Sequence, residues 1–172
     1  MDGSMKILVV GATGTIGEAV VKLLEARHEV LRASHSRSTL TVDLADPGSI
    51  KSLFAKVGRV DAVVSTAGQA VFRPLPDLTD ADFAVCLSNK LMGQVNLVRF
   101  GIASLADGGS FTLTSGILSR KPAPGGAAIS IVNAGIEGFA RAAALELPRG
   151  VRVNAVAPDW VRETLVAMKM DP

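Results

Sequence analysis

The chain has 172 residues, enough for one domain with a buried core, and its charges nearly balance, with a formal net charge of +2. Aromatic residues make up 4% of the chain and the basic residues are dispersed, which argues against nucleic acid as a partner. No apolar run reaches the length of a membrane span and no secretory signal pattern is visible, so we expect no membrane partner. The single cysteine, Cys86, cannot form an internal disulfide, which predicts a protein of the reducing cytoplasm.

Residues 1–4 precede a second methionine, Met5, and we interpret them as a cloning remnant. The remaining residues, 5–172, are predicted to form a single domain. In chain order, apolar runs and helical periodicity predict a strand at residues 6–10, a helix at 16–24, strands at 29–33 and 39–42, a helix at 47–57, a strand at 61–65, a helix at 79–100, a strand at 110–114, a helix at 129–147 and a strand at 151–155. The long helix from Thr79 begins with a sequence that resembles a capping box, with Asp82 where Glu or Gln is preferred.

The alternation of strands and helices predicts an α/β fold with a parallel, doubly wound sheet and right-handed crossovers. Sheets of this kind bind ligands outside the carboxyl ends of their strands. Four segments with suggestive chemistry follow predicted strands at that edge, namely residues 11–17, 65–68, 114–115 and 157–158. We therefore expect the functional site there.

Glycines follow the first strand with the spacing G-x-x-G-x-x-G and open the first predicted helix. Gly11 permits a tight turn, Gly14 leaves room for phosphates, and Gly17 lets the helix pack closely on the strand. The N–H groups at a helix N-terminus favour an anion such as a pyrophosphate. Glycine turns without a ligand also occur, but the context of strand, turn and helix predicts dinucleotide binding. The residues predicted to contact the dinucleotide are Gly11, Thr13, Gly14, Thr15, Ile16 and Gly17.

The segment after the second strand distinguishes between the two nicotinamide cofactors. NAD-specific sites place an acidic residue there to hold the ribose hydroxyls, and residues 33–38 contain none. Serine hydroxyls and a guanidinium instead suit a 2′-phosphate. An ordinary polar loop is the alternative for each residue taken alone. We predict NADP rather than NAD, with contacts from Ser34, His35, Ser36 and Arg37.

Further motifs follow the later strands. Asp43-Leu44 follows the third strand, Ser65-Thr-Ala-Gly68 the fourth, Thr114-Ser115 the fifth, and residues 151–158 form the sixth strand and its turn. With the glycine turn and the helix around Asn133, these motifs resemble the short-chain dehydrogenase/reductase family over residues 5–164. The resemblance implies a three-layer Rossmann fold with strand order 3-2-1-4-5-6 and without the family's usual last strand. It also implies cofactor contacts from Asp43, Leu44, Ala67, Gly68 and Pro158.

The chain departs from the family at the catalytic pair. The family's Tyr-x-x-x-Lys aligns with Ile129 and Asn133, and the chain has no tyrosine. In the family, the tyrosine exchanges a proton with the substrate oxygen, while the lysine lowers the tyrosine pKa and holds the nicotinamide ribose. Ile129 cannot transfer a proton, and such assistance is worth about a hundred- to ten-thousandfold in rate. Asn133 can still bind a ribose hydroxyl, so cofactor binding is expected to survive where the standard proton relay does not.

Two other residues are candidates for the chemistry. Ser115 aligns with the family's catalytic serine and is expected to hold the substrate oxygen; the alternative is an ordinary polar residue at a strand end. The family's helical asparagine aligns with Lys90, with Asn89 as the neighbouring alternative. An inward Lys90 supplies a cation and a proton donor, whereas an outward one is a surface lysine. Near the same site, residues 119–121 either hold an anionic substrate or form a solvated charged loop, and we favour the loop. Trp160 belongs either to a substrate loop or to the core.

The sequence leaves three functions open. The first is an NADP-dependent oxidoreductase that acts on a carbonyl or alcohol through a non-standard proton donor, with catalytic residues Ser115, Lys90 and Asn133. The second is a catalytically silent NADP-binding sensor or scaffold, which the loss of both tyrosine and lysine favours. The third, isomerisation of a nucleotide-linked substrate, also needs the missing tyrosine. No spacing of His or Cys suggests a metal site.

Self-association into a homodimer or homotetramer is also expected. The predicted helices at residues 79–100 and 129–147 correspond to the helices that pair across the family's dimer axis. Four small residues on the second helix would permit close approach of a partner, namely Ala140, Ala142, Ala143 and Ala144.

Overall fold

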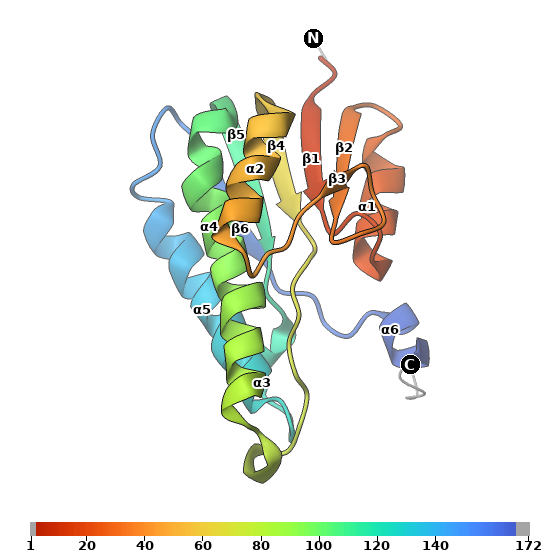
Figure 1. Ribbon diagram of the computed structural model, residues 1–172, viewed down its shortest axis with the longest axis vertical. Coiled ribbons are helices and arrows are strands. Elements are labelled where there is room, and N and C mark those ends of the chain that lie inside the picture. Colours follow the sequence, from red (N-terminus) through yellow and green to blue (C-terminus); the bar gives the residue numbers. More distant parts are fainter. Residues whose placement is uncertain (1–2, 168–172) are drawn as a thin grey trace.

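The computed structural model describes residues 3–167 and contains one parallel sheet of six strands flanked by helices (Figure 1). The strands are β1 (Lys6–Val10), β2 (Glu29–Ser34), β3 (Leu40–Thr41), β4 (Val60–Ser65), β5 (Leu105–Thr114) and β6 (Arg152–Val156). Their order is β3-β2-β1-β4-β5-β6, which confirms the predicted Rossmann order. The reversal of strand order between β1 and β4 opens a crevice at the carboxyl edge of the sheet. The remnant predicted at residues 1–4 lies partly outside the described residues.

Helices cover both faces of the sheet. They are α1 (Thr15–Leu24), α2 (Pro47–Val57), α3 (Asp80–Val85), α4 (Met92–Gly101), α5 (Ala127–Ala143) and α6 (Arg162–Ala167), with short 3-10 helices at Leu75–Asp77, Ile102–Ser104 and Ile117–Ser119. Side chains of β1 alternate between the two faces. Leu8 and Val10 pack in the core with residues of α2, α4 and α5, whereas Ile7 and Val9 pack against α1. Because β1 is buried on both faces, its sequence is a continuous apolar run rather than an alternating one.

The long helix predicted at residues 79–100 is present but contains one irregular turn. Its capping box is confirmed: Asp82 donates its N–H to Thr79 Oγ1 at 3.2 Å, and Thr79 donates its N–H to Asp82 Oδ2 at 2.9 Å. Between α3 and α4 the chain forms a π-helix, Cys86–Leu91. Such wide turns are frequent at functional sites. The apolar spacing of the sequence did not reveal it, because a single wide turn shifts the helical phase by only one residue.

The predicted start of β5 is wrong. The strand begins at Leu105 rather than at residue 110, because Gly108 and Gly109 form an irregularity within the strand instead of a turn before it. A Cβ on Gly109 would lie 2.7 Å from the Asp61 carbonyl oxygen. The close approach of β4 and β5 at this point therefore requires glycine.

The last long helix is also displaced from its predicted bounds. α5 spans Ala127–Ala143 instead of residues 129–147, and Ala144 is its C-cap. Ala140 is only 5% exposed and packs in the core of the chain itself. The prediction that Ala140 is available for close approach of a partner is therefore wrong, because this part of the helix face is turned toward the sheet.

A buried glutamine fixes α4 to the end of β5. Gln94 is fully buried, its Nε2 donates to the Thr114 carbonyl oxygen at 2.8 Å, and its Oε1 accepts from the Thr114 N–H at 2.8 Å. One side chain thus satisfies both backbone groups of Thr114, next to the edge where the site lies.

Candidate functional site

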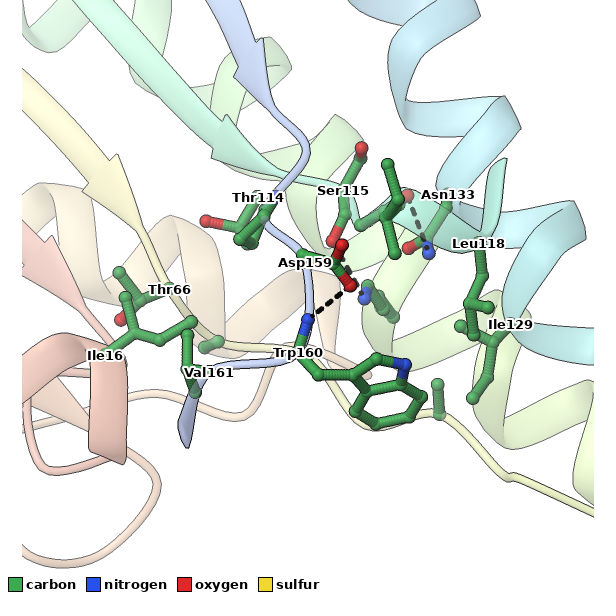
Figure 2. A pocket seen from close by; sticks show the side chains of 17 residues that line it. Ile16, Thr66, Thr114, Ser115, Leu118, Ile129, Asn133, Asp159, Trp160 and Val161 are labelled. Carbon is green, nitrogen blue, oxygen red and sulfur yellow. Dashed lines mark hydrogen bonds between the residues drawn. The ribbon is translucent and has the colours of Figure 1, made fainter. Parts of the chain in front are cut away.

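A pocket of about 370 Å³ opens at the carboxyl edge of the sheet, beyond the ends of β1, β4, β5 and β6. In Figure 2, Ile16 and Thr66 lie on one side of it, Leu118 and Ile129 on the other, and Trp160 between them. Seven of the residues predicted for the site line this one pocket, namely Ile16, Ala67, Gly68, Lys90, Ser115, Asn133 and Pro158. The fold therefore brings together residues that are far apart in the sequence.

The glycine turn is held by close packing at two of its three glycines. Gly11 has a φ of +88°, and a Cβ there would lie 2.8 Å from the Ala67 backbone nitrogen; a Cβ on Gly17 would overlap the Gly11 carbonyl oxygen. By contrast, a Cβ on Gly14 would meet only that oxygen, at 3.4 Å, and otherwise open space. Gly14 is also the N-cap of α1 and has no side-chain cap, so the first N–H groups of the helix can bind a ligand.

The segment predicted to select NADP lies against the glycine turn. Arg37 Nη2 donates to the Thr13 carbonyl oxygen at 2.7 Å, and the Arg37 N–H donates to Ser34 Oγ at 2.9 Å. Ser34 is buried, whereas His35 and Ser36 are exposed. A second cavity is lined by Thr13, Ser36 and Arg37, among others. The hydroxyl of Ser36 and the guanidinium of Arg37 thus lie at the same cavity beside α1. Both groups have N–H or O–H donors that could bind a ligand.

Asp43 and Leu44 follow β3 and lie outside the main pocket. Asp43 Oδ1 accepts a hydrogen bond from the Ala45 N–H at 2.9 Å, which leaves its other carboxylate oxygen for a further donor. Leu44 is buried, and a Cβ on Gly93 would lie 2.7 Å from its Cβ. The close contact between Leu44 and α4 explains the glycine at position 93.

The loop after β4 connects the glycine turn to the π-helix. Thr66 Oγ1 lies within hydrogen-bond distance of the Val10 and Gly11 carbonyl oxygens, at 3.2 Å from each. Two residues on, Gly68 has a φ of +149°, and a Cβ there would lie 2.8 Å from Lys90 Cγ. Gly68 therefore leaves the space through which the Lys90 side chain enters the pocket.

The π-helix decides which residue faces the pocket. Asn89 Oδ1 accepts from the Gln69 N–H at 2.8 Å, and Cys86 Sγ accepts from the Val71 N–H at 3.2 Å, so both are used to hold the loop. Lys90 instead lines the pocket, and its Nζ donates to the Ser115 carbonyl oxygen at 3.3 Å. Burial lowers the pKa of Lys90, and the nearby Cys86 thiol partly opposes this effect. The interpretation of Lys90 as a surface lysine is therefore wrong.

Helix α5 presents two side chains to the pocket, one of them the predicted site residue Asn133. Ile129 and Asn133 both line the pocket. Asn133 is 1% exposed and its Nδ2 donates to the Gly116 carbonyl oxygen at 3.3 Å. Its Oδ1 is buried and has no hydrogen-bond partner among the described residues. A buried acceptor of this kind is expected to bind a donor supplied by a ligand or water.

One residue that the sequence reasoning missed lies one turn further along α5. Glu137 Oε1 accepts from Ser115 Oγ at 2.7 Å and from Ser119 Oγ at 2.6 Å, and Arg120 Nε lies 3.4 Å from Oε2. Residues 119–121 are therefore not simply a solvated loop. Positions 129, 133 and 137 are spaced four residues apart, so the helical period of the sequence already places Glu137 on the same face of α5.

The mouth of the pocket is formed by the segment after β6. Pro158, Asp159, Trp160 and Val161 all line it. The rings of Trp160 and Phe72 meet edge to face, with centroids 6.0 Å apart and planes at 84°. Trp160 therefore belongs to the pocket wall rather than to the main core. Across residues 3–167, no helix is both long and apolar enough to cross a membrane.

Comparisons with known proteins identify the family. A family model described as enoyl-(acyl carrier protein) reductase matches residues 11–171. Hydroxynaphthalene reductase arp2 of Aspergillus fumigatus is 34% identical over 131 residues, which are 73% of this chain and 48% of the relative. Oxidoreductase UcpA of Escherichia coli is 26% identical over 181 residues, covering 90% of this chain and 68% of the relative. The chain thus spans about half the length of the hydroxynaphthalene reductases that it matches.

Solved structures agree with this assignment. Protein lin1944 of Listeria innocua is 46% identical and has a TM-score of 0.94 over 96% of this chain and 83% of that one. A small-chain dehydrogenase in complex with NADPH is 32% identical, with a TM-score of 0.83 over 91% of this chain and 70% of that one. Together with the strand order, these matches show that the chain belongs to the short-chain dehydrogenase/reductase family.

Proposed function

We propose that the chain is an NADP-dependent oxidoreductase of the cytoplasm that transfers a hydride between the nicotinamide and the carbonyl or alcohol carbon of a small substrate. Membership of the family and the NADPH complex of a 32% identical relative support this proposal. When bound, NADPH supplies the hydride. The remaining task of the protein is to bind the cofactor, orient the substrate and exchange a proton with the substrate oxygen.

The polar groups of the carboxyl edge fit this cofactor. The open space before Gly14 and the uncapped start of α1 suit a pyrophosphate, and the Arg37 guanidinium suits a 2′-phosphate. The buried Asn133 Oδ1 needs a donor, which a ribose hydroxyl would supply. Asp43 retains a carboxylate oxygen, which would bind the adenine end of the cofactor. These groups together support NADP as the cofactor. NAD lacks the 2′-phosphate, so we expect it to bind more weakly.

The observation that carries the catalytic proposal is the position of Lys90 Nζ in the pocket. The ammonium group has three N–H donors, and one of them is directed to the Ser115 carbonyl oxygen. A second can donate to the substrate oxygen and transfer a proton to it as the hydride arrives. Burial lowers the Lys90 pKa toward neutral pH, which makes the ammonium a better general acid than an exposed lysine.

The size and lining of the pocket favour a small substrate that is largely apolar. The cofactor's nicotinamide end and the substrate must share about 370 Å³. The pocket wall includes Leu118 and Ile129, whose side chains offer only apolar contact, and Trp160, whose ring adds apolar surface and one indole N–H donor. We infer a substrate with one reacting oxygen and an apolar body.

A second function, a catalytically silent NADP-binding sensor or scaffold, is favoured by one specific observation. Ile129 and Asn133 both line the pocket. By the predicted alignment, they replace the family's proton-transferring tyrosine and its lysine. In this alternative, Lys90 would bind the nicotinamide end of the cofactor without any proton transfer. Cofactor binding is common to both functions, so only turnover distinguishes them.

The first experiment is calorimetric titration with NADP⁺, NADPH, NAD⁺ and NADH. We expect the Kd for NADPH to be lower than that for NADH by about tenfold or more, because only NADPH offers the 2′-phosphate to Arg37. Replacing Arg37 with Ala should reduce this preference, whereas replacing the exposed Arg27 with Ala should not. If none of the four nucleotides binds, both proposed functions are wrong.

The second experiment measures NADPH oxidation with small aldehydes and ketones. We expect Lys90→Met to lower the rate by about 100-fold or more, since it removes the general acid, while Lys56→Met on the exposed surface of α2 should leave the rate unchanged. Reduction requires protonated Lys90, so the rate should fall as pH rises through a pKa below 10.5. NADPH binding without any turnover would favour the silent alternative. Full activity in Lys90→Met would instead show that Lys90 is not the general acid.

A further inference from the structure

A carboxylate lies directly behind the residue that aligns with the family's catalytic serine. Ser115 is 3% exposed, lines the pocket, and donates its hydroxyl proton to Glu137 Oε1 at 2.7 Å. Ser119 donates to the same oxygen at 2.6 Å, and Arg120 approaches the other oxygen at 3.4 Å. All three contacts come from the segment that follows β5, so Glu137 of α5 ties this wall of the pocket to the helix.

The charge of Glu137 fixes the direction of these hydrogen bonds. Burial alone would raise its pKa, but the hydrogen bonds from Ser119 and Ser115, together with the Arg120 guanidinium, leave the pKa below its usual value. Arg141 also lines the groove beside Glu137. Glu137 is therefore an ionised carboxylate, which can only accept hydrogen bonds.

A serine hydroxyl has a single proton to donate. Because Glu137 holds the proton of Ser115, the free lone pairs of Ser115 Oγ can accept a hydrogen bond but the hydroxyl has no proton left for the pocket. On the opposite side of the same residue, the Ser115 carbonyl oxygen accepts from Lys90 Nζ. Ser115 thus connects Glu137 with Lys90 and contributes no donor of its own.

We propose that Glu137 is a positioning residue that makes Ser115 a hydrogen-bond acceptor toward the pocket and leaves Lys90 as the donor to the substrate oxygen. The inference rests on the proposed oxidoreductase function and refines it. It differs from the expectation drawn from the family resemblance, in which Ser115 holds the substrate oxygen. In this arrangement a carbonyl substrate accepts a hydrogen bond from Lys90, and an alcohol substrate can donate a hydrogen bond to Ser115 Oγ, which keeps its own proton.

The hydrogen bond itself can be tested without any substrate. The ¹³C signal of the Glu137 carboxylate, identified by its loss in Glu137→Gln, is titrated with pH in the full chain. We expect the Glu137 pKa to rise in Ser115→Ala, because a donor to the ionised form is lost. Ser130→Ala is the matched control, since Ser130 lies on the same helix but donates to the Leu118 carbonyl oxygen. An unchanged Glu137 pKa in Ser115→Ala would overturn the proposal.

The consequence for catalysis is tested by a double-mutant cycle on NADPH oxidation. We expect Ser115→Ala to lower kcat by less than about fivefold in the wild-type background, and by much more in the Glu137→Gln background. The amide introduced by Glu137→Gln can donate an N–H to Ser115 Oγ, which returns the hydroxyl proton to the pocket. Glu137→Asp keeps a carboxylate and should behave like the wild type.

Failure of the proposed oxidoreductase function and failure of the proposed role of Glu137 give different results. Absence of NADPH turnover in the wild-type chain contradicts the proposed function, while the carboxylate titration still decides whether Ser115 donates to Glu137. Turnover in which Ser115→Ala alone costs as much as Lys90→Met would show that Ser115 donates to the substrate, and would overturn the proposal. An equal effect of Ser115→Ala in both backgrounds would also overturn it.

Discussion

The three glycines of the cofactor turn are needed for different reasons. Gly11 and Gly17 are required by packing, because any Cβ at these positions would collide with the Ala67 backbone or with the Gly11 carbonyl oxygen. Gly14 is not required by packing, since a Cβ there would face open space. Packing therefore constrains Gly11 and Gly17 but not Gly14, for which we propose a role in binding, and substitution can separate the two roles.

We expect Gly17→Ala to lower the free energy of unfolding by about 3 kcal/mol, because helix α1 must move away from the turn. Gly14→Ala should cost only about 1 kcal/mol as a poorer N-cap, yet raise the Kd for NADPH by about tenfold or more. Urea denaturation and calorimetry measure the two quantities on the same samples. If Gly14→Ala binds NADPH as tightly as the wild type, the pyrophosphate does not lie against this turn.

At the scale of elements, the site depends on how α4 and the π-helix are fixed to the sheet. Gln94 ties α4 to the last residue of β5, and Asn89 and Cys86 tie the π-helix to the loop after β4. In each of these hydrogen bonds, a side chain of the helical segment pairs with a backbone group at or just after the end of a strand. They also determine the orientation of Lys90, which lies between them in the chain.

Replacing Gln94 with Met keeps the side-chain volume but leaves the N–H and carbonyl groups of Thr114 without their partner. We expect a loss of roughly 2–4 kcal/mol in the free energy of unfolding, since each buried unpaired group costs about 1–3 kcal/mol. Urea denaturation is the measurement. Gln69→Met, at an exposed position, is the control and should change stability by less than about 0.5 kcal/mol. A neutral Gln94→Met would mean that water or neighbouring groups replace both bonds.

For the whole molecule, the crevice lies between two halves of the sheet. One half consists of β1 to β3 with α1, and the other of β4 to β6 with α4 and α5 (Figure 1). The predicted cofactor contacts come from both halves, from Gly11–Gly17 in the first and from residues around Asn133 and Pro158 in the second. A bound dinucleotide would therefore connect the halves and resist global unfolding.

We expect NADPH at about 100 times its Kd to raise the free energy of unfolding by about 2.7 kcal/mol, because only the folded chain binds it. NADH at the same concentration should stabilise less. The chain has one tryptophan, Trp160, and it lines the pocket, so its fluorescence should be quenched in parallel. Trp160→Phe should lose the optical signal and keep the stabilisation. Stabilisation without quenching in the wild type would place the nicotinamide end away from Trp160.

Much of the fold could be predicted from the sequence by itself. Alternating apolar runs and helical periods predicted the parallel sheet, because burial on two faces requires those patterns. The glycine turn was equally readable, since only glycine tolerates such close backbone packing. The absence of tyrosine is likewise a property of the sequence. The start of β5 was missed, because Gly108 and Gly109 occur in turns and in strand irregularities alike.

Only the tertiary structure decided which side chains face the pocket. Lys90 enters it because a π turn changes the helical phase there and Gly68 leaves space for the side chain, neither of which the apolar pattern records. Ser115 and Glu137 are 22 residues apart in sequence, and their hydrogen bond exists only because α5 packs beside the end of β5. Local sequence fixes backbone patterns, whereas the direction of one hydroxyl proton depends on which charged group the fold places next to it.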